Sequence, residues 1–384
     1  MKRIAYVCAD PGVPVFGCKG SSVHVQEVIR AFIRGGASIT LFARRFGGDT
    51  PAGLEAVKCI ALPRPSTNDA AARERALFEV NADLPGRLDA EPVFDMVYER
   101  HALWSHAAMI WARSRSVPAV LEVNAPLIEE QAEHRVLHDR AAAEASARRA
   151  YDAADHTIAV SSGVAAWLAE FGVMETKLHV IPNGVDTRRF LPVEHGGASK
   201  LTIGFVGTLK PWHGLSILVE AARIALKADV PVRLLIVGDG PERASLQGQL
   251  AAAGLGRVSE LTGAVEPAKI PALIARMDVA VAPYPQQPNF YFSPLKIMEY
   301  MAAGRAVIAS RIGDIDGLVT DEVDGLLCPA GDAQAFADAI IRLHRDPELR
   351  ANLGFAARDK AVRELGWDSV VERILDLAVE TVPC

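Results

Sequence analysis

Three polar side chains stand together at the start of a helix that the sequence predicts just after the apolar segment DVAVAPY: Ser293, Lys296 and Glu299. Ser293 can cap this helix, and the free amides of its first turn can hold an anion. Lys296 and Glu299 are three residues apart and therefore share a helical face, where the lysine suits a phosphate and the carboxylate suits the two hydroxyls of a ribose. The same spacing is also that of an ordinary i,i+3 ion pair, and both interpretations stay open.

A second candidate lies in GFVGTLKPWHG, residues 204–214, where an apolar strand ends in a glycine and a lysine follows three residues later. Lys210 would be a mobile positive charge beside the amides of the next helix, an arrangement that neutralises a diphosphate. The alternative is a surface lysine in a turn, which is the common situation of a lysine.

Two further glycine-rich loops are weaker signals. Residues 10–22 hold Gly12, Gly17 and Gly20 ahead of a helix whose first amides suit a phosphate or carboxylate, although a flexible connection is equally compatible. The segment VGDGP at 237–241 follows an apolar strand, but Arg243 occupies the third position of the dinucleotide fingerprint. A GxG without that third glycine is weak support for NAD binding.

The sequence offers no convincing pattern for a metal site or for a hydrolase nucleophile. The DxD in GDIDG (313–317) lies in a glycine-punctuated turn and is interpreted as a solvated turn, so no metal site is predicted. Ser161 and Ser162 follow a strand, but AVSSG lacks the GxSxG frame of a hydrolase nucleophile. No cofactor is expected.

The elements that must position these residues alternate regularly along the chain. Short apolar runs such as RIAYVCA and SITLFARR alternate with amphipathic stretches, which indicates parallel sheets with helices on both faces. The pattern stops in the polar, glycine-rich segment 192–200 and then begins again. We therefore predict an α/β fold of two Rossmann-like, doubly wound domains, the first over 1–191 and the second over 199–365.

Composition agrees with two soluble domains. The chain has 384 residues, half of them apolar, and 41 basic against 47 acidic side chains give a net charge of 41 − 47 = −6, which offers no general attraction for nucleic acid. Five scattered cysteines form no metal or disulfide pattern, and no apolar run reaches the roughly 18 residues of a membrane span. We expect a cytoplasmic protein. Arg140, Arg148 and Arg149 suggest a weak, peripheral contact with the inner face of a membrane.

The motifs together resemble glycosyltransferase family 4. The resemblance is carried by HVIPNGVDTRRF, GFVGTLKPWHG, LLIVGDGP, LTGAV and SPLKIMEYMAAGRAVIAS, in this order along the second half of the chain. VYERHALW at 97–104 and LEVNAP at 121–126 are similar to a bacterial branch of the family. The resemblance implies a GT-B fold, with two domains facing a cleft and a final helix, residues 366–384, crossing back onto the first domain.

The resemblance also implies a function. A sugar would pass from a nucleoside diphosphate sugar to an acceptor such as a polysaccharide, glycolipid or small molecule, with the anomeric configuration retained and no metal. Lys210, Lys296 and Glu299 would be the catalytic residues, because the lysines would stabilise the departing diphosphate. The residues expected to bind the donor are Gly20, Gly207, Thr208, Gly238, Gly263, Val265, Tyr291, Ser293, Pro294 and Leu295. Those expected on the acceptor side are His24, Glu99, Arg100 and Asn124.

The chain departs from the family pattern at several of these positions. The first glutamate of the family's motif, eight residues before Glu299, is replaced by Tyr291. The usual arginine and lysine of the opening loop fall on Thr208 and His213. Asn124, close to Glu122, lies where many relatives have a histidine.

These departures keep other functions open. A nucleotide-sugar epimerase of the same architecture needs no acceptor, and a non-catalytic nucleotide-sugar binder is compatible with Tyr291. A dehydrogenase with paired Rossmann-like sheets ranks last, because the fingerprint is incomplete.

Overall fold

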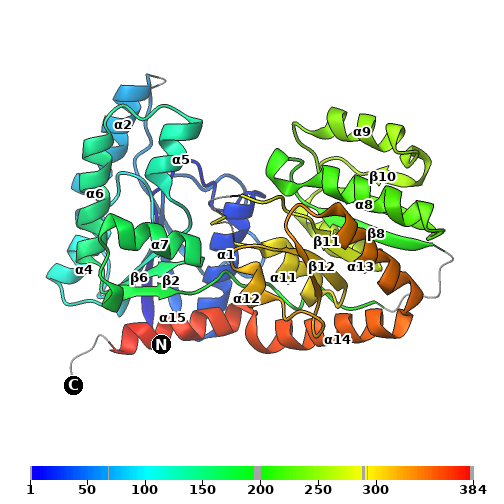
Figure 1. Ribbon diagram of the computed structural model, residues 1–384. Helices are drawn as coiled ribbons and strands as arrows, with labels where there is room; N and C mark the ends of the chain where they lie inside the picture. Colours follow the sequence, from blue (N-terminus) through cyan, green and yellow to red (C-terminus); the bar gives the residue numbers. More distant parts are fainter. Residues whose placement is uncertain (1, 68, 194–199, 288–289, 292, 381–384) are drawn as a thin grey trace. The chain divides into compact units, whose positions relative to one another are not determined.

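The computed structural model describes residues 2–67, 69–193, 200–287, 290–291 and 293–380, and its contacts divide the chain into two compact units. The first unit comprises residues 1–183 and 367–384 and the second residues 184–366. Each is built around one parallel sheet (Figure 1). The prediction of two doubly wound α/β domains is confirmed.

The first sheet has seven strands in the order β3-β2-β1-β4-β5-β6-β7. The strands are β1 (Arg3–Cys8), β2 (Ser38–Ala43), β3 (Lys58–Ala61), β4 (Met96–Arg100), β5 (Ala119–Val123), β6 (His156–Ala159) and β7 (Leu178–Val180). The helices are α1 (Gly20–Arg34), α2 (Ala70–Phe78), α3 (Val80–Asp89), α4 (Ala107–Ser114), α5 (Leu127–His134), α6 (Arg140–Ala153), α7 (Ser162–Phe171) and α15 (Trp367–Glu380). The strand order reverses between β1 and β4, the place where such sheets bind ligands.

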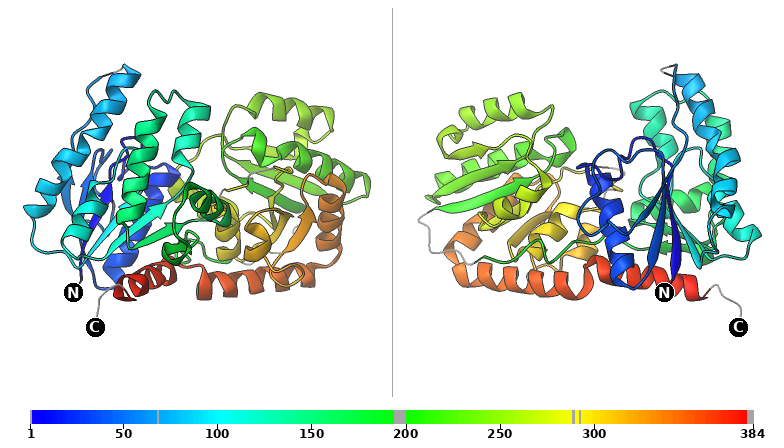
Figure 2. Two further views of the ribbon diagram at one scale, coloured as in Figure 1. Left: turned by 60° about the vertical axis from the view of Figure 1, so that its left-hand side comes forward. Right: turned by 180° about the vertical axis from the view of Figure 1, so that it is seen from behind.

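Helices α1 and α15 pack together on one face of this sheet, and α4 and α6 pack against the region of β4 and β5 (Figures 1 and 2). One hydrophobic cluster joins strand residues such as Tyr6 and Tyr98 to Phe32 of α1 and Ile374 of α15. The last helix therefore completes the core of the first unit, because its apolar face packs beside α1.

The second sheet has six strands in the order β10-β9-β8-β11-β12-β13. They are β8 (Leu201–Val206), β9 (Val232–Val237), β10 (Ser259–Leu261), β11 (Val279–Ala282), β12 (Ala306–Arg311) and β13 (Leu326–Pro329). The helices are α8 (Leu215–Lys227), α9 (Arg243–Ala252), α10 (Ile270–Ile274), α11 (Leu295–Ala302), α12 (Ile315–Leu318), α13 (Ala333–Arg345) and α14 (Pro347–Glu364). Here the order reverses between β8 and β11, so the loops after these two strands are the place to look for a ligand.

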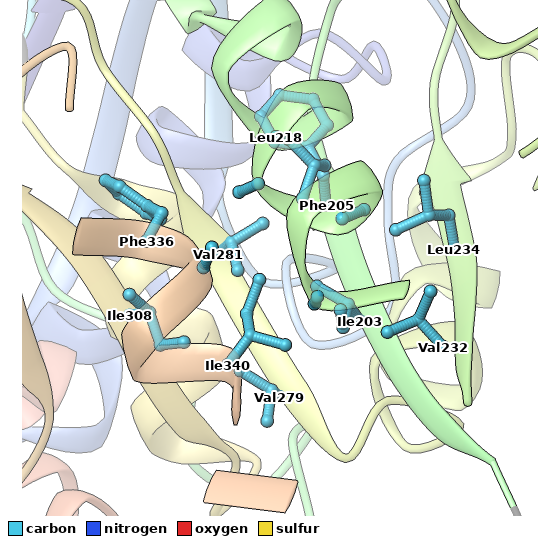
Figure 3. Packing of buried hydrophobic residues seen from close by; sticks show 14 of the residues in the cluster. Ile203, Phe205, Leu218, Val232, Leu234, Val279, Val281, Ile308, Phe336 and Ile340 are labelled. Carbon is cyan, nitrogen blue, oxygen red and sulfur yellow. The ribbon is translucent and has the colours of Figure 1, made fainter. Parts of the chain in front are cut away.

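Two clusters of buried side chains cover the two faces of the second sheet. On one face α8, α9 and α13 contribute, and Figure 3 shows Leu218 and Phe336 packed over Phe205 and Val281. On the other face α10, α11 and α14 contribute residues such as Ile274, Met298 and Ala357. Burial of both faces explains why the strands are continuous apolar runs rather than alternating ones.

The boundary between the units differs from the prediction, because residues 184–191 belong to the second unit. The amide of Val185 donates to the carbonyl of Leu365, and Phe190 is buried in the second unit's core. The Arg358 guanidinium also donates to the carbonyls of Thr187 and Phe190. Tertiary packing thus holds a segment that the sequence pattern had assigned to the preceding domain. Most of the predicted linker 192–200 lies outside the described residues.

Other local differences have physical causes. The stretch 127–153, interpreted as one long charged and alanine-rich segment, is divided into α5 and α6 by residues 135–139. Strand β3 and helix α14 were not predicted. Strand β3 is an exposed edge strand, and α14 buries only a narrow stripe of residues, Leu353, Gly354, Ala357 and Ala361. No helix among the described residues is long and apolar enough to cross a membrane.

Candidate functional site

The carboxyl ends of the central strands of the second unit are packed so closely that only glycine fits. A Cβ on Gly238, which follows β9, would lie 2.0 Å from the carbonyl oxygen of Gly207, which follows β8. A Cβ on Gly214 would lie 1.8 Å from the carbonyl oxygen of Pro283, which follows β11. All three glycines have positive φ, so a side chain would be strained as well as blocked. The predicted residues Gly207 and Gly238 are therefore neighbours.

Lys296, in the first turn of α11, reaches this crowded edge. A Cβ on Gly207 would lie 3.1 Å from its Nζ, which is 4.4 Å from the centre of the Phe205 ring and 5.1 Å from that of Tyr284. Its Nζ is buried and has no hydrogen-bond partner among the described residues. Burial lowers the pKa of Lys296 to about 7, against the opposing charge of Glu299.

Glu299 lies one turn further along α11 and does not neutralise the lysine. Because Lys296 Nζ is unpartnered within the described chain, the interpretation of these two residues as an ordinary ion pair is wrong. Burial raises the pKa of Glu299 to about 7, although the charges of Arg189 and Lys296 oppose that shift. Within the described part of the chain, this helix thus carries an ammonium without a hydrogen-bond partner and a carboxyl whose pKa is raised to about 7, a combination characteristic of functional sites.

The predicted cap of α11 is wrong. The helix begins at Leu295 with Pro294 as its N-cap residue, and no side chain caps it. Ser293 lies one residue too early, and its buried Oγ has no hydrogen-bond partner among the described residues. The first turn consequently keeps uncapped amides beside Lys296, and the Ser293 hydroxyl remains available to a ligand. Tyr291 is partly buried in the segment before this helix.

The loop after β8 places Thr208, Lys210 and His213 near the same edge. His213 Nδ1 hydrogen-bonds the carbonyl oxygen of Thr208, and its ring contacts those of Phe205 and Tyr284. Lys210 is partly exposed, with its Nζ 5.3 Å from the centre of the Trp212 ring. Lys210 from this loop and Lys296 from α11 therefore lie near the same edge of the sheet.

The loop after β10 brings in two more of the predicted donor-binding residues. Gly263 forms an isolated antiparallel bridge with Gly238, and a Cβ on it would lie 3.4 Å from Nη1 of Arg243. Val265 packs against the cluster that contains α11. The glycines of three neighbouring loops are thereby brought together, as the motif set predicts.

Of the predicted acceptor-side residues of the first unit, His24 and Glu99 are buried, and Arg100 and Asn124 are partly exposed. His24 of α1 contacts both carboxylate oxygens of Glu122, Nε2 to Oε2 being 2.9 Å, and Asn124 Nδ2 donates to Oε2 at 2.9 Å. Burial by itself would raise the pKa of Glu122, but the charge and hydrogen bond of His24, helped by Arg100 and Asn124, lower it to about 2. Trp367 of α15 packs edge-on against the His24 ring, 5.1 Å between centres.

Glu99 is fully buried at the end of β4, where the hydroxyl of Ser105 donates to it at 2.6 Å. Burial raises its pKa to about 7. Arg100 next to it is partly exposed, whereas Gly20 is exposed as the first residue of α1. The structure therefore brings His24, Asn124 and Arg100 around Glu122. Glu99 instead accepts a hydrogen bond from Ser105, and Gly20 lies at the surface.

Several groups at these sites escaped the sequence-based prediction. Phe205 and Tyr284 form the aromatic surface around Lys296, and the positive charge of Arg189 opposes the rise in the pKa of Glu299. Tyr284 ends the apolar segment DVAVAPY and Arg189 lies in HVIPNGVDTRRF, so both were within motifs already singled out. Glu122, noted only as a neighbour of Asn124, is the residue that holds His24 in place.

Two other expectations concern charged groups elsewhere. Asp316 of the DxD pair is engaged with Arg311 in an ion pair, and within the described ranges no three residues of metal-ligating type gather into a site. Arg140 pairs with Glu129 and Glu144, and Arg148 donates to the carbonyl of Phe171. These two arginines are therefore engaged within the protein.

Two family profiles match successive parts of the chain. Residues 19–189 match the profile described as Glycosyltransferase Family 4, and residues 200–346 match that described as Glycosyl transferases group 1. The chain belongs to glycosyltransferase family 4. The family resemblance and the GT-B fold predicted for this glycosyltransferase are confirmed.

Similar bacterial proteins support the assignment of this glycosyltransferase. The D-inositol 3-phosphate glycosyltransferase of Kribbella flavida is 27% identical over 393 residues, covering 93% of this chain and 89% of the relative. The phosphatidyl-myo-inositol mannosyltransferase of Mycobacterium leprae is 33% identical over 222 residues, which is 57% of each chain. The match to the first of these spans both units.

Solved structures with the same fold include the sucrose-phosphate synthase of Thermosynechococcus elongatus, with a TM-score of 0.72, 21% identity and coverage of 99% of both chains. Anabaena HepE in complex with UDP and glucose has a TM-score of 0.69 at 19% identity, covering 99% of this glycosyltransferase and 100% of HepE. These likenesses establish the GT-B fold.

Proposed function

We propose that this glycosyltransferase transfers a sugar from a nucleoside diphosphate sugar to an acceptor hydroxyl, with retention of the anomeric configuration and without a metal. The observation that carries the proposal is the buried Nζ of Lys296 beside Gly207, which has no hydrogen-bond partner among the described residues and lies where the strand order of the second sheet reverses. A buried cation without a partner is unfavourable unless a ligand supplies the opposite charge. A diphosphate supplies it.

The chemistry follows from where charge develops. Cleavage of the bond between the sugar and the diphosphate leaves negative charge on the phosphate oxygens and positive charge on the anomeric carbon. Lys296, Lys210 and the uncapped amides of α11 stabilise the departing anion. Glu299 accepts hydrogen bonds from the hydroxyls of the ribose, a role suited to a carboxylate.

Retention requires that the acceptor approach on the face from which the diphosphate leaves. An oxygen of the departing phosphate then takes the acceptor's proton, so the reaction needs no protein nucleophile. The charges that would otherwise come from a metal are supplied by the lysines and amides. On the acceptor side, the buried Glu122 contacts His24, accepts a hydrogen bond from Asn124 and interacts with the charge of Arg100.

Similar proteins support the substrate classes. HepE has been crystallised with UDP-glucose, and the curated relatives carry names that describe inositol phosphate and phosphatidylinositol acceptors. We infer that this enzyme takes a nucleoside diphosphate sugar and a polyhydroxylated acceptor, which is a polysaccharide, a glycolipid or a small molecule. We also propose that the reaction takes place in the cytoplasm.

The decisive test incubates the purified protein with UDP-glucose, UDP-N-acetylglucosamine and GDP-mannose, with and without a panel of polyol acceptors. Release of the nucleoside diphosphate is measured in the presence of EDTA, and the anomeric configuration of any product is read by NMR. We expect acceptor-dependent release with retention, and a severe loss in Glu299→Ala. Absence of turnover together with unchanged nucleotide binding by Glu299→Ala would contradict the proposal.

A second candidate is a non-catalytic nucleotide-sugar binder. It is favoured by Tyr291, which replaces the first glutamate of the family's motif. Calorimetric binding of a nucleotide sugar without turnover on any acceptor would support this alternative, whereas acceptor-independent interconversion of two nucleotide sugars would indicate an epimerase.

A further inference from the structure

His213 and Lys296 are two nitrogen bases that share the same aromatic surroundings. The His213 ring lies 5.6 Å from the centre of Phe205 and 5.9 Å from that of Tyr284. Lys296 Nζ lies 4.4 Å and 5.1 Å from the same two ring centres. The two bases therefore occupy one small region beside Gly207, although they come from different elements.

The hydrogen bond of His213 determines its tautomer. Because the carbonyl oxygen of Thr208 can only accept, His213 Nδ1 must carry the donated hydrogen. In the neutral ring Nε2 then holds a lone pair, and it has no hydrogen-bond partner among the described residues. A neutral imidazole in this orientation presents an acceptor toward its surroundings, where the lysine usual at this family position would present a permanent positive charge.

The free protein disfavours protonation of both bases. Burial and, to a smaller extent, the positive charges of Lys296 and Lys210 lower the pKa of His213 to about 4. The hydrogen bond to the carbonyl of Thr208 opposes this shift. Burial lowers the pKa of Lys296 to about 7, and only Glu299 opposes it. Around the pair, the remaining charged and titratable groups are Lys210 on the loop, Glu299 on α11 and Tyr284 after β11.

A bound dianion reverses this balance. Two negative charges close to the pair favour the protonated form of each base, since opposite charges at short range stabilise the charged state. Protonated His213 keeps its bond to Thr208 and gains a donor at Nε2, where it previously had a lone pair.

We propose that His213 and Lys296 act as a proton-coupled pair, so that binding of a nucleoside diphosphate sugar draws protons from solvent onto them. This inference rests on the proposed function, because it concerns the diphosphate of the donor. No covalent step is involved: solvent or buffer supplies each proton, and the proton returns when the nucleotide leaves. The affinity for the donor consequently falls as the pH rises, by at most about tenfold per pH unit for each proton taken up.

The test is titration calorimetry with UDP-glucose and GDP-mannose, whose esterified diphosphates do not titrate near neutral pH. The slope of the binding enthalpy against the ionisation enthalpy of three buffers gives the number of protons taken up. At pH 7.5 most of the uptake is expected from Lys296, roughly one proton at most, whereas at pH 6.0 that lysine is already charged and the uptake comes from His213.

Two variants separate the contributions. His213→Gln keeps an amide donor for Thr208 but cannot titrate, so it should lose the uptake at pH 6.0 and keep that at pH 7.5. Lys296→Met should lose the uptake at pH 7.5 while the uptake at pH 6.0 persists. Glu299→Gln is the matched control, because it removes the other group whose pKa lies near 7 and should leave the His213 contribution at pH 6.0 in place.

The outcomes distinguish this inference from the proposed function. Tight binding with an enthalpy independent of the buffer, or unchanged uptake at pH 6.0 in His213→Gln, would overturn the proton-coupled pair and leave donor binding intact. If neither nucleotide sugar binds at any pH, both the pair and the assigned donor class are overturned.

Discussion

Glu122 of the first unit and Lys296 of the second unit both lie near the strands where the sheet order reverses, but their surroundings differ. In the first unit Glu122 is held by His24 and Asn124 through hydrogen bonds, and its pKa is low because these contacts favour the carboxylate. In the second unit Lys296 has a buried Nζ without a partner in the described chain, and its pKa falls to about 7.

This difference distinguishes charged groups that stabilise the fold from charged groups that are suited to bind a ligand. A buried charge with complete hydrogen bonding is already satisfied and orients its neighbours, whereas a buried charge without a partner costs stability until a counter-charge arrives. The comparison therefore predicts that changes in the first unit reduce stability, while changes at Lys296 and Lys210 reduce binding and turnover.

The largest effect on stability is expected for His24→Ala. Removing the imidazole leaves the Glu122 carboxylate buried with only Asn124 and nearby Arg100, which should cost about 3–5 kcal/mol of unfolding free energy. Chemical denaturation followed by circular dichroism measures this loss. As a control, Asp368→Ala breaks the exposed ion pair with Arg34 and should cost less than about 1 kcal/mol. Equal losses in the two variants would contradict the proposed importance of the buried pair.

Lys296→Met should show the opposite pattern. Its ammonium has no hydrogen-bond partner within the described residues, so replacing it by an apolar side chain of similar length should leave the unfolding free energy unchanged or increase it. Transfer should fall on the order of 100-fold, since one group that stabilises the leaving anion is lost. Initial rates with saturating donor and a melting curve on the same sample measure both. A variant that turns over normally would remove Lys296 from the site.

A smaller effect is expected for Lys210→Ala. Lys210 is partly exposed beside Trp212, so its charge is more strongly screened than that of Lys296. We expect the Kd for UDP-glucose to rise about tenfold and to depend less on salt, with no change in melting temperature. The titration is repeated at low and high ionic strength, and an unchanged Kd at both would place Lys210 outside the donor site.

The pH dependence of stability distinguishes the units by pH range, because stability rises with pH in both but over different windows. Lys296 has a folded pKa of about 7 against an ordinary value of 10.5, so the unfolded chain binds more protons between these values and stability rises with pH there. Glu122 has a folded pKa of about 2 against 4.5, so its contribution is complete above 4.5 and is lost as the pH falls toward 2.

Denaturation across pH measures both contributions, each with a slope of at most about 1.4 kcal/mol per pH unit. Lys296→Met should flatten the alkaline rise and Glu122→Gln the acid loss. If one variant altered the profile in the other's window, the assignment of these groups would be wrong.

Much of the second unit's edge was predictable because its glycines are demanded by backbone geometry. Gly207, Gly238 and Gly263 have positive φ and approach backbone or side-chain atoms closely, so their positions persist in recognisable motifs. The prediction failed for Ser293, since the start of α11 depends on how Pro294 enters the helix rather than on the presence of a capping residue.

The sequence alone determined the alternation of strands and helices, the two parallel sheets and the family, because apolar periodicity and glycine spacing are local properties of the chain. Only the tertiary structure decided which charges are paired. The His24–Glu122 contact joins residues 98 positions apart, and Lys296 reaches Gly207 from helix α11. Whether a buried charge finds a partner depends on distances across the sheet, which no spacing along the chain encodes.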